Sequence, residues 1–201
     1  MRHNLMHPAL GLIETSTIVA GIEVADALAK RAPVVLLRLF ALTPGKLVVA
    51  FAGDEAAVEE SYRRGLEVAG GAVLDSLYLP GVEPRVTEAL LSGGVRAQAE
   101  GAALGAVETH TVAACALAAD AALKAAGVAL IEMRLRRELG GKGYFLICGA
   151  QDAVEAAVEA AIEAIARLSG STMLAGTLVI PRPHEDMLRE LLAAHEGGIW
   201  S

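Results

Sequence analysis

Short apolar runs alternate along this chain with stretches in which apolar residues recur at helical spacing. In residues 18–30, Ile18, Ile22, Ala25 and Ala29 would share one face of a helix. The turn residues Thr43-Pro44-Gly45 separate two apolar runs and predict a hairpin. The first half is therefore predicted to form strands at 9–14, 34–39, 47–52 and 73–79, with helices at 18–30, 55–69 and 84–91.

The same sequence pattern recurs in the second half of the chain. Ala9-Leu10-Gly11-Leu12-Ile13-Glu14-Thr15 returns 94 residues later as Ala103-Leu104-Gly105-Ala106-Val107-Glu108-Thr109, and residues 9–30 share 11 identities in 22 positions with residues 103–124. After a slip of two residues, Gly45-Lys46 matches Gly141-Lys142. This period is too long for a solenoid repeat, so it indicates the tandem duplication of a small domain.

The second half repeats the order of elements. It is predicted to contain strands at 103–108, 128–135, 143–148 and 173–180, and helices at 110–125, 151–168 and 184–195. Each copy reads β-α-β-β-α-β plus a terminal helix, which is typical of the ferredoxin-like split βαβ arrangement. The predicted fold class is α+β, an α/β sandwich of two tandem ferredoxin-like domains, at residues 9–92 and 102–196.

Charge and composition exclude several classes of function. The net charge of −7 offers no general attraction to nucleic acid. The apolar region 101–133 is interrupted by charged residues, so no membrane span is predicted, and the first eight residues carry no secretory signal. Cys115 and Cys148 are expected to be buried thiols in a reducing cytosol. Neither a phosphate loop nor a metal-ligand spacing is present.

Taken together, the repeated motifs resemble the tandem-domain, trimeric shell proteins of bacterial microcompartments, in the non-permuted, propanediol-utilisation branch of that family. The resemblance covers residues 9 to about 195. The motifs that carry it are the two opening strands, Asp26-x-x-x-Lys30, Asp120-x-x-x-Lys124, Thr43-Pro44-Gly45-Lys46, Gly140-Gly141-Lys142 and Ile180-Pro181-Arg182-Pro183-His184.

The resemblance implies a structural, non-enzymatic role. In that family, three two-domain chains form a pseudohexameric tile with a central pore, and the tile meets hexameric and pentameric shell proteins in a cytoplasmic microcompartment. Small metabolites would pass through the pore. Carried over to this chain, the pore-lining residues would be Leu42, Thr43, Pro44, Gly45, Leu139, Gly140 and Gly141, and the edge contacts Lys30, Lys124, Arg182 and His184.

The resemblance also bears on cofactors. Some family members place a cysteine where this chain has Thr43, and three such thiolates can hold an iron–sulfur cluster. Because Cys115 and Cys148 lie outside both turns, we expect no cluster and no other cofactor or metal. Arg134, Arg136 and Arg137 precede the second turn, and near a threefold axis they would favour anionic metabolites by electrostatic focusing.

Two other functions remain open from the residues alone. Duplicated ferredoxin-like domains also bind small molecules between copies, which would make the chain a ligand-binding regulator. An enzyme using Glu108 and His110 is the second alternative. For Glu14 and Glu108, which end equivalent strands, buried or helix-capping carboxylates are the favoured interpretation.

Overall fold

The computed structural model describes residues 8–92, 103–135, 141–168 and 171–193. Two four-stranded sheets organise the chain, one for each copy of the repeat. The first copy consists of β1 (Ala9–Thr15), α1 (Ile18–Arg31), β2 (Val35–Leu42), β3 (Lys46–Gly53), α2 (Glu55–Ala69), η1 (Gly70–Ala72), β4 (Val73–Pro80) and α3 (Pro84–Ser92).

The second copy repeats this order. It consists of β5 (Ala103–Thr109), α4 (Val112–Ala125), β6 (Ala129–Arg134), β7 (Gly143–Gly149), α5 (Gln151–Leu168), η3 (Ser171–Met173), β8 (Leu174–Pro181) and α6 (Glu185–Ala193). The hairpin before Lys46 has a longer first strand than predicted, because β2 extends to Leu42. Helix α4 starts two residues later than predicted, since Thr111 is its N-cap and its hydroxyl accepts the N–H of Ala114.

Both sheets have the same strand order. It is β2-β3-β1-β4 in the first copy and β6-β7-β5-β8 in the second, with antiparallel neighbours. This is the ferredoxin-like order, so the predicted fold class is confirmed. The registers also define which residues are equivalent. Ala9 pairs with Pro80 as Ala103 pairs with Pro181, and Gly53 pairs with Ala9 as Gly149 pairs with Ala103.

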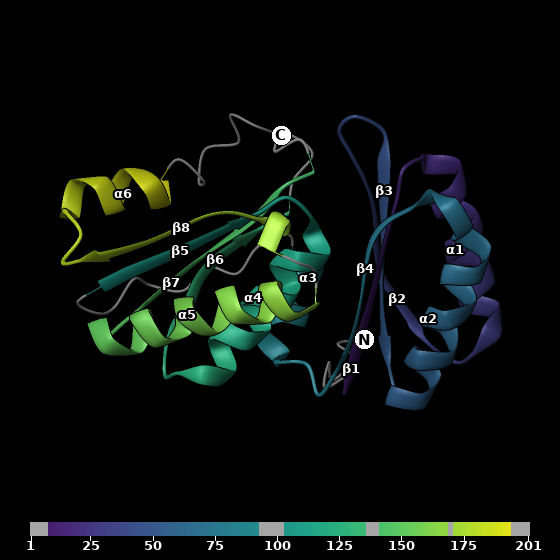
Figure 1. Ribbon diagram of the computed structural model, residues 1–201, viewed down its shortest axis with the longest axis horizontal. Coiled ribbons are helices and arrows are strands. Elements are labelled where there is room, and N and C mark those ends of the chain that lie inside the picture. Colours follow the sequence, from purple (N-terminus) through teal and green to yellow (C-terminus); the bar gives the residue numbers. More distant parts are fainter. Residues whose placement is uncertain (1–7, 93–102, 136–140, 169–170, 194–201) are drawn as a thin grey trace.

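The first sheet is covered on both faces. On one face, Ile13 and Phe51 pack with residues of α1 and α2. On the other face, Leu10, Leu12 and Leu77 join one hydrophobic cluster with α4 of the second copy. Figure 1 shows this sheet standing between α1 and α2 on one side and α3 and α4 on the other. The two copies are thus packed together through a shared core, which we call the internal seam.

The second sheet is covered differently. Helices α4 and α5 pack on one face, while α6 reaches the opposite face through Leu188 and Leu191, beside Leu104 and Ile131. Among the described residues, no other helix lies over the rest of that opposite face (Figure 1). None of the helices in the described ranges is long and apolar enough to cross a membrane.

Candidate functional site

The internal seam is built around helix α4. From Val112 to Ala119 every side chain of this helix is buried, because sheet residues of both copies surround it. Its small side chains, Ala113 and Ala116 among them, allow close approach to the first sheet. The fully apolar pattern of 112–119 is therefore the signature of a helix buried between two domains.

Polar groups fix the seam as well as apolar ones. The Glu14 carboxylate accepts the N–H of Ala113 through Oε1 at 2.7 Å, at the N-terminus of α4. The Thr111 hydroxyl donates to Asp75. At the other end of α4, Arg85 donates through Nη1 to the Val128 carbonyl at 2.9 Å. Each of these bonds joins one copy of the repeat to the other.

The sequence predicts a buried or helix-capping carboxylate at both Glu14 and Glu108. Glu14 is buried and caps the helix of the other copy, whereas the prediction is wrong for Glu108, which is exposed and paired with Lys142. Burial raises the pKa of Glu14 to about 7, and the nearby Asp75 charge acts in the same direction, while the Ala113 N–H and the Lys46 charge act against it. Its Oε2 atom is buried and has no partner among the described residues. The seam therefore holds one titratable group whose ionisation is costly.

The surfaces equivalent to the two sides of the seam are exposed elsewhere on the chain. Ile22 stands in α1 where Ala116 stands in α4, and its side chain is 57% exposed whereas that of Ala116 is fully buried. Leu178 stands in β8 where Leu77 stands in β4, and it is 49% exposed against 6%. The other exposed apolar residues with buried equivalents are Ile18, Val19, Leu36, Leu39 and Met187.

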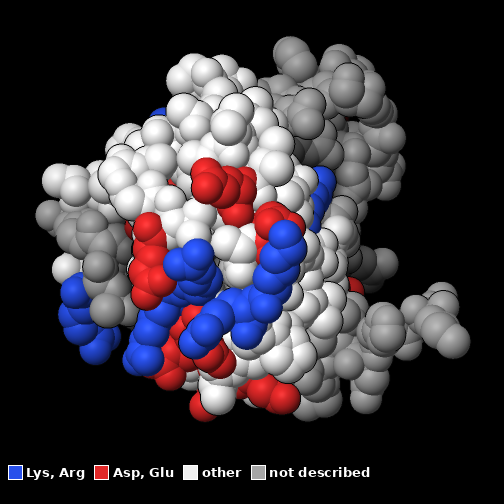
Figure 2. Space-filling model, turned by 90° about the vertical axis from the view of Figure 1, so that its right-hand side faces the viewer, with Lys and Arg blue, Asp and Glu red and all other residues white. Residues whose placement is uncertain are grey.

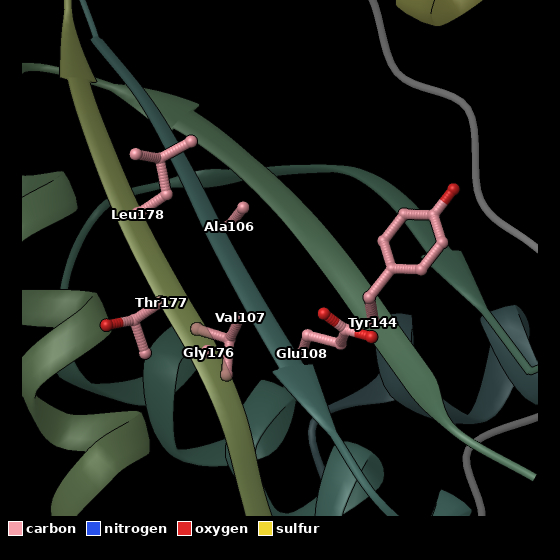
Figure 3. A pocket seen from close by; sticks show the side chains of 7 residues that line it. All are labelled: Ala106, Val107, Glu108, Tyr144, Gly176, Thr177 and Leu178. Atoms are coloured by element: carbon pink, nitrogen blue, oxygen red, sulfur yellow. The ribbon is translucent and has the colours of Figure 1, made fainter.

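The open face of the second sheet is hollowed. A pocket of about 480 Å³ is lined by Ala106, Val107, Glu108, Tyr144, Gly176, Thr177 and Leu178. Figure 3 shows these residues on three neighbouring strands, with Leu178, Ala106 and Tyr144 projecting from the sheet. We call this hollow the second-sheet pocket. It lies at the position that α4 occupies on the first sheet.

Gly141, at the end of the second predicted turn, lies next to Lys46, which follows the first turn. A Cβ on Gly141 would lie 3.0 Å from Nζ of Lys46, the residue that follows the first turn. Gly141 has φ +87°, a conformation that favours glycine. In the first turn the Gly45 N–H donates to the Leu42 carbonyl at 2.8 Å. Gly141 and Lys46 are thus neighbours in the structure, whereas the lining of a pore stays a prediction.

The predicted pore residues differ in what they can contribute. The Leu42 side chain is buried in the core of the internal seam, so only its backbone belongs to the turn. Thr43, Pro44 and Gly45 form the turn itself, with a cis peptide bond between Thr43 and Pro44. Leu139 and Gly140, together with Arg136 and Arg137, lie outside the described residues.

The predicted edge residues lie at three places. Lys30 pairs with Asp26 at 2.6 Å on the exposed face of α1, while Lys124 pairs with Asp120, whose side chain is buried in the seam. Arg182 and His184 are exposed between β8 and α6. Arg182 has φ +52°, where the first copy has Gly81 at φ +62°.

The candidate catalytic and basic groups have structural partners. Glu108 forms an ion pair with Lys142 at 2.9 Å. The His110 side chain is exposed, and its backbone N–H donates to the Met173 carbonyl. Arg134 is paired with Glu132 and is largely buried, so it does not belong to a solvated basic cluster. Within the described ranges, no group of three His, Cys, Asp or Glu residues is placed to hold a metal ion.

Both cysteines are buried, as predicted. Burial raises the pKa of the Cys115 thiol to about 12, so it remains protonated at neutral pH. Cys115 lies in α4 and Cys148 in β7, and neither belongs to a turn.

Comparison with known proteins identifies the family. Residues 9–82 and 103–183 each match the BMC domain. The chain therefore belongs to the BMC-domain family of bacterial microcompartment shell proteins, with two domains in tandem.

The relatives agree over nearly the whole chain. The bacterial microcompartment shell protein PduT of Citrobacter freundii is 37% identical over 187 residues, which cover 93% of this chain and 99% of PduT. A crystal structure of a microcompartment protein from Desulfitobacterium hafniense has a TM-score of 0.78 and 38% identity, covering 90% of this chain and 98% of its own. A fused permuted hexameric shell protein, MSM0275, shares the fold with a TM-score of 0.63 at 22% identity, covering 80% of this chain and 82% of its own.

Proposed function

We propose that the chain is a homotrimeric, pseudohexameric tile of a microcompartment shell, with a central pore for small metabolites. The observation that carries this proposal is the match between two exposed surfaces and the two sides of the internal seam. Helix α1 is the equivalent of buried α4, and the second-sheet pocket is the equivalent of the surface that α4 covers. The α1 helix of one chain would dock in the second-sheet pocket of the next.

The side chains support this docking by complementary changes in size. On the helix, Ala116 of the seam corresponds to the larger Ile22 of α1, and Ala113 to Val19. On the sheet, Leu12 corresponds to the smaller Ala106. The exchange of Ala116 for Ile22 adds as many side-chain carbons as the exchange of Leu12 for Ala106 removes. The bulkier face of α1 thus matches the additional space in the second-sheet pocket.

Such a contact is heterologous, because the two docking surfaces differ, and it generates a ring if the rotation closes. Each chain already contains one such step between its own two domains. Three chains would provide six domains and six equivalent seams, of which three are internal and three lie between chains. Full burial of Ile22, Val19 or Leu178 would contribute about 1.5–3 kcal/mol for each side chain.

The pore follows from the same arrangement. Within one chain, Gly141 lies next to Lys46, which follows the turn at Thr43–Gly45. In the ring, three copies of each turn would surround the axis, and Thr43 would offer its hydroxyl to the passing solute. Leu139 and Gly140 are proposed to complete this lining. No cofactor is proposed there, because thiolates are absent from the first turn.

The rim of the tile would carry the lateral contacts. Lys30, Lys124, Arg182 and His184 are proposed to meet neighbouring hexameric and pentameric shell proteins. The outer face over α1 and α2 is different in character, because its charges are interleaved and mutually paired (Figure 2). The pairs there are Arg31–Glu60, Arg63–Glu59 and Arg64–Glu67. We therefore assign the lateral contacts to the four rim residues.

The direct experiment is a cryo-electron microscopy reconstruction of the purified protein. We expect a threefold ring in which Gly45 and Gly141 lie next to the axis, with α1 of each chain in the second-sheet pocket of the next. A reconstruction with these two glycines at the periphery would refute the proposal. The two alternatives have their own signatures: a regulator would form a dimer whose melting depends on a metabolite, and an enzyme would lose turnover on Glu108→Gln.

A further inference from the structure

Each copy has a glutamate and a lysine at equivalent positions, Glu14 and Lys46 in the first and Glu108 and Lys142 in the second. Only the second pair forms a direct ion pair. In the second copy, Glu108 Oε1 lies 2.9 Å from Lys142 Nζ, and both side chains are partly exposed. In the first copy, Glu14 is buried in the internal seam and accepts the N–H of Ala113. Within the described parts of the chain, no carboxylate oxygen lies within 4 Å of Lys46 Nζ. Glu14 therefore makes no direct ion pair with Lys46, although the Lys46 charge still lowers its pKa.

Lys46 extends to the adjacent turn. Its Nζ, Cε and Cδ atoms lie 3.0–3.4 Å from the position that a Cβ on Gly141 would take. Lys142 follows Gly141 directly in the chain. One lysine of each copy is consequently placed at the paired turns that we propose for the pore.

The internal seam shows what happens to the glutamate when a helix docks. Docking of α4 brings its N-terminal N–H groups to Glu14, and these favour the carboxylate, although burial outweighs them and raises the pKa of Glu14 to about 7. The equivalent of Ala113 in α1 is Val19, at the exposed N-terminal turn of that helix. The equivalent of Glu14 is Glu108, at the edge of the second-sheet pocket (Figure 3).

We propose that ring closure transfers Glu108 from Lys142 to the N-terminus of α1 of the neighbouring chain, and that Lys46 and the released Lys142 then form a site for a small, multiply charged oxyanion at the axis. This inference rests on the proposed trimer and specifies the class of ligand for its pore. Three chains would place three copies of each lysine around the axis. Cationic side chains that ring a constriction select for anions, and such convergence concentrates the field.

Assembly and charge are coupled in this arrangement. In the separate chain the Lys142 charge is neutralised locally, and the second-sheet pocket is open to water. In the ring the same glutamate stabilises the contact between chains, and its former partner faces the axis. The anion site is therefore complete only in the assembled tile.

The test uses the full-length protein and inorganic phosphate as the probe. Binding is measured by isothermal titration calorimetry at constant ionic strength, with chloride as the reference anion, after ultracentrifugation has established the oligomeric state. We expect phosphate to bind the trimer. Lys46→Met and Lys142→Met should each raise the Kd for phosphate tenfold or more without dissociating the trimer. Lys46→Arg, which keeps the charge, should retain the phosphate binding that Lys46→Met loses.

Two variants separate this inference from the trimer itself. Arg63→Met removes a cation that is already paired with Glu59 on α2, and it should leave phosphate binding unchanged. Ile22→Asp should give a separate chain that no longer binds phosphate. A wild-type trimer without preference for phosphate, or Lys46→Met with unchanged affinity, would refute the anion site and leave the trimer standing. A separate chain that binds phosphate as tightly as the trimer would refute the coupling. A wild-type protein that does not trimerise would overturn the proposed function as well.

Discussion

Ile22 and Ala116 occupy the same position in the two copies, but one is exposed and the other is buried. The Ala116 side chain is fully buried in the internal seam, whereas that of Ile22 is 57% exposed. In the proposed ring, Ile22 is buried in the second-sheet pocket of the next chain. A charge at this position would then have to be buried without a partner, at a cost of several kcal/mol.

The first prediction is that Ile22→Asp prevents trimer formation and leaves each chain folded, because the side chain does not contribute to the core of its own domain. Sedimentation velocity and far-UV circular dichroism check the two parts. The matched control is Ala56→Asp, which adds the same charge at an exposed position of α2 where the second copy already carries Asp152. Ala56→Asp should remain trimeric, and a trimeric Ile22→Asp would contradict the docking of α1.

A second prediction concerns pH. Since the pKa of Glu14 rises from 4.5 to about 7 on folding, the folded state binds more protons than the unfolded state between these values. The stabilising contribution of this group is fully present below pH 4.5 and is lost as the pH rises through 7. The loss amounts to about 3 kcal/mol.

Glu14→Gln removes this ionisation while keeping an oxygen for the Ala113 N–H. Urea unfolding should show that the variant gains stability relative to the wild type as the pH rises from 4.5 to 8. Glu163→Gln, an exposed carboxylate on α5, serves as the control and should show no such trend. A difference between Glu14→Gln and the wild type that stays constant with pH would contradict the buried ionisation.

A third prediction addresses the polar bonds of the internal seam. Arg85 donates to the carbonyls of Val128 and Leu123 and pairs with Glu83. Arg85→Met should lower the free energy of unfolding by about 1–3 kcal/mol, because two seam carbonyls lose a charged donor. Arg167→Met removes an exposed pair with Glu163 near the end of α5 and should cost less than about 1 kcal/mol. Equal effects of the two substitutions in urea unfolding would argue against a structural role for Arg85.

A fourth prediction separates the fold of the chain from lateral tiling. Arg182 adopts a positive φ at the position where the first copy has Gly81, so Arg182→Gly relieves backbone strain and should not lower the melting temperature. The variant should remain trimeric but fail to form two-dimensional arrays in negative-stain electron microscopy. Arg63→Met, on the paired charges of α2, should form arrays like the wild type. Normal arrays from Arg182→Gly would remove this arginine from the proposed edge.

Much of the fold could be predicted because the duplication shows each element twice. Both cysteines are buried as expected, and the strand order follows from the split βαβ unit. The docking of the copies could not be predicted in this way. Local sequence assigns Glu14 to the end of a strand, but only the packed structure shows that its partner is Ala113, 99 residues away.

The lysines of the candidate site were missed for a related reason. In the sequence, Lys46 and Lys142 stand out only as part of the repeat, and nothing local links them to Glu14 and Glu108. The available signal was the pair Glu14–Lys46, which recurs as Glu108–Lys142 after the slip of two residues. What distinguishes the two pairs is the burial of Glu14, which depends on the docking of α4 and is not encoded locally.

The mass of the native particle tests the central claim most directly. Sedimentation equilibrium of the wild-type protein should give three times the chain mass of 20.7 kDa, because one ring step is already made within each chain and three chains complete the ring. A particle with the mass of one chain or of two would contradict the account.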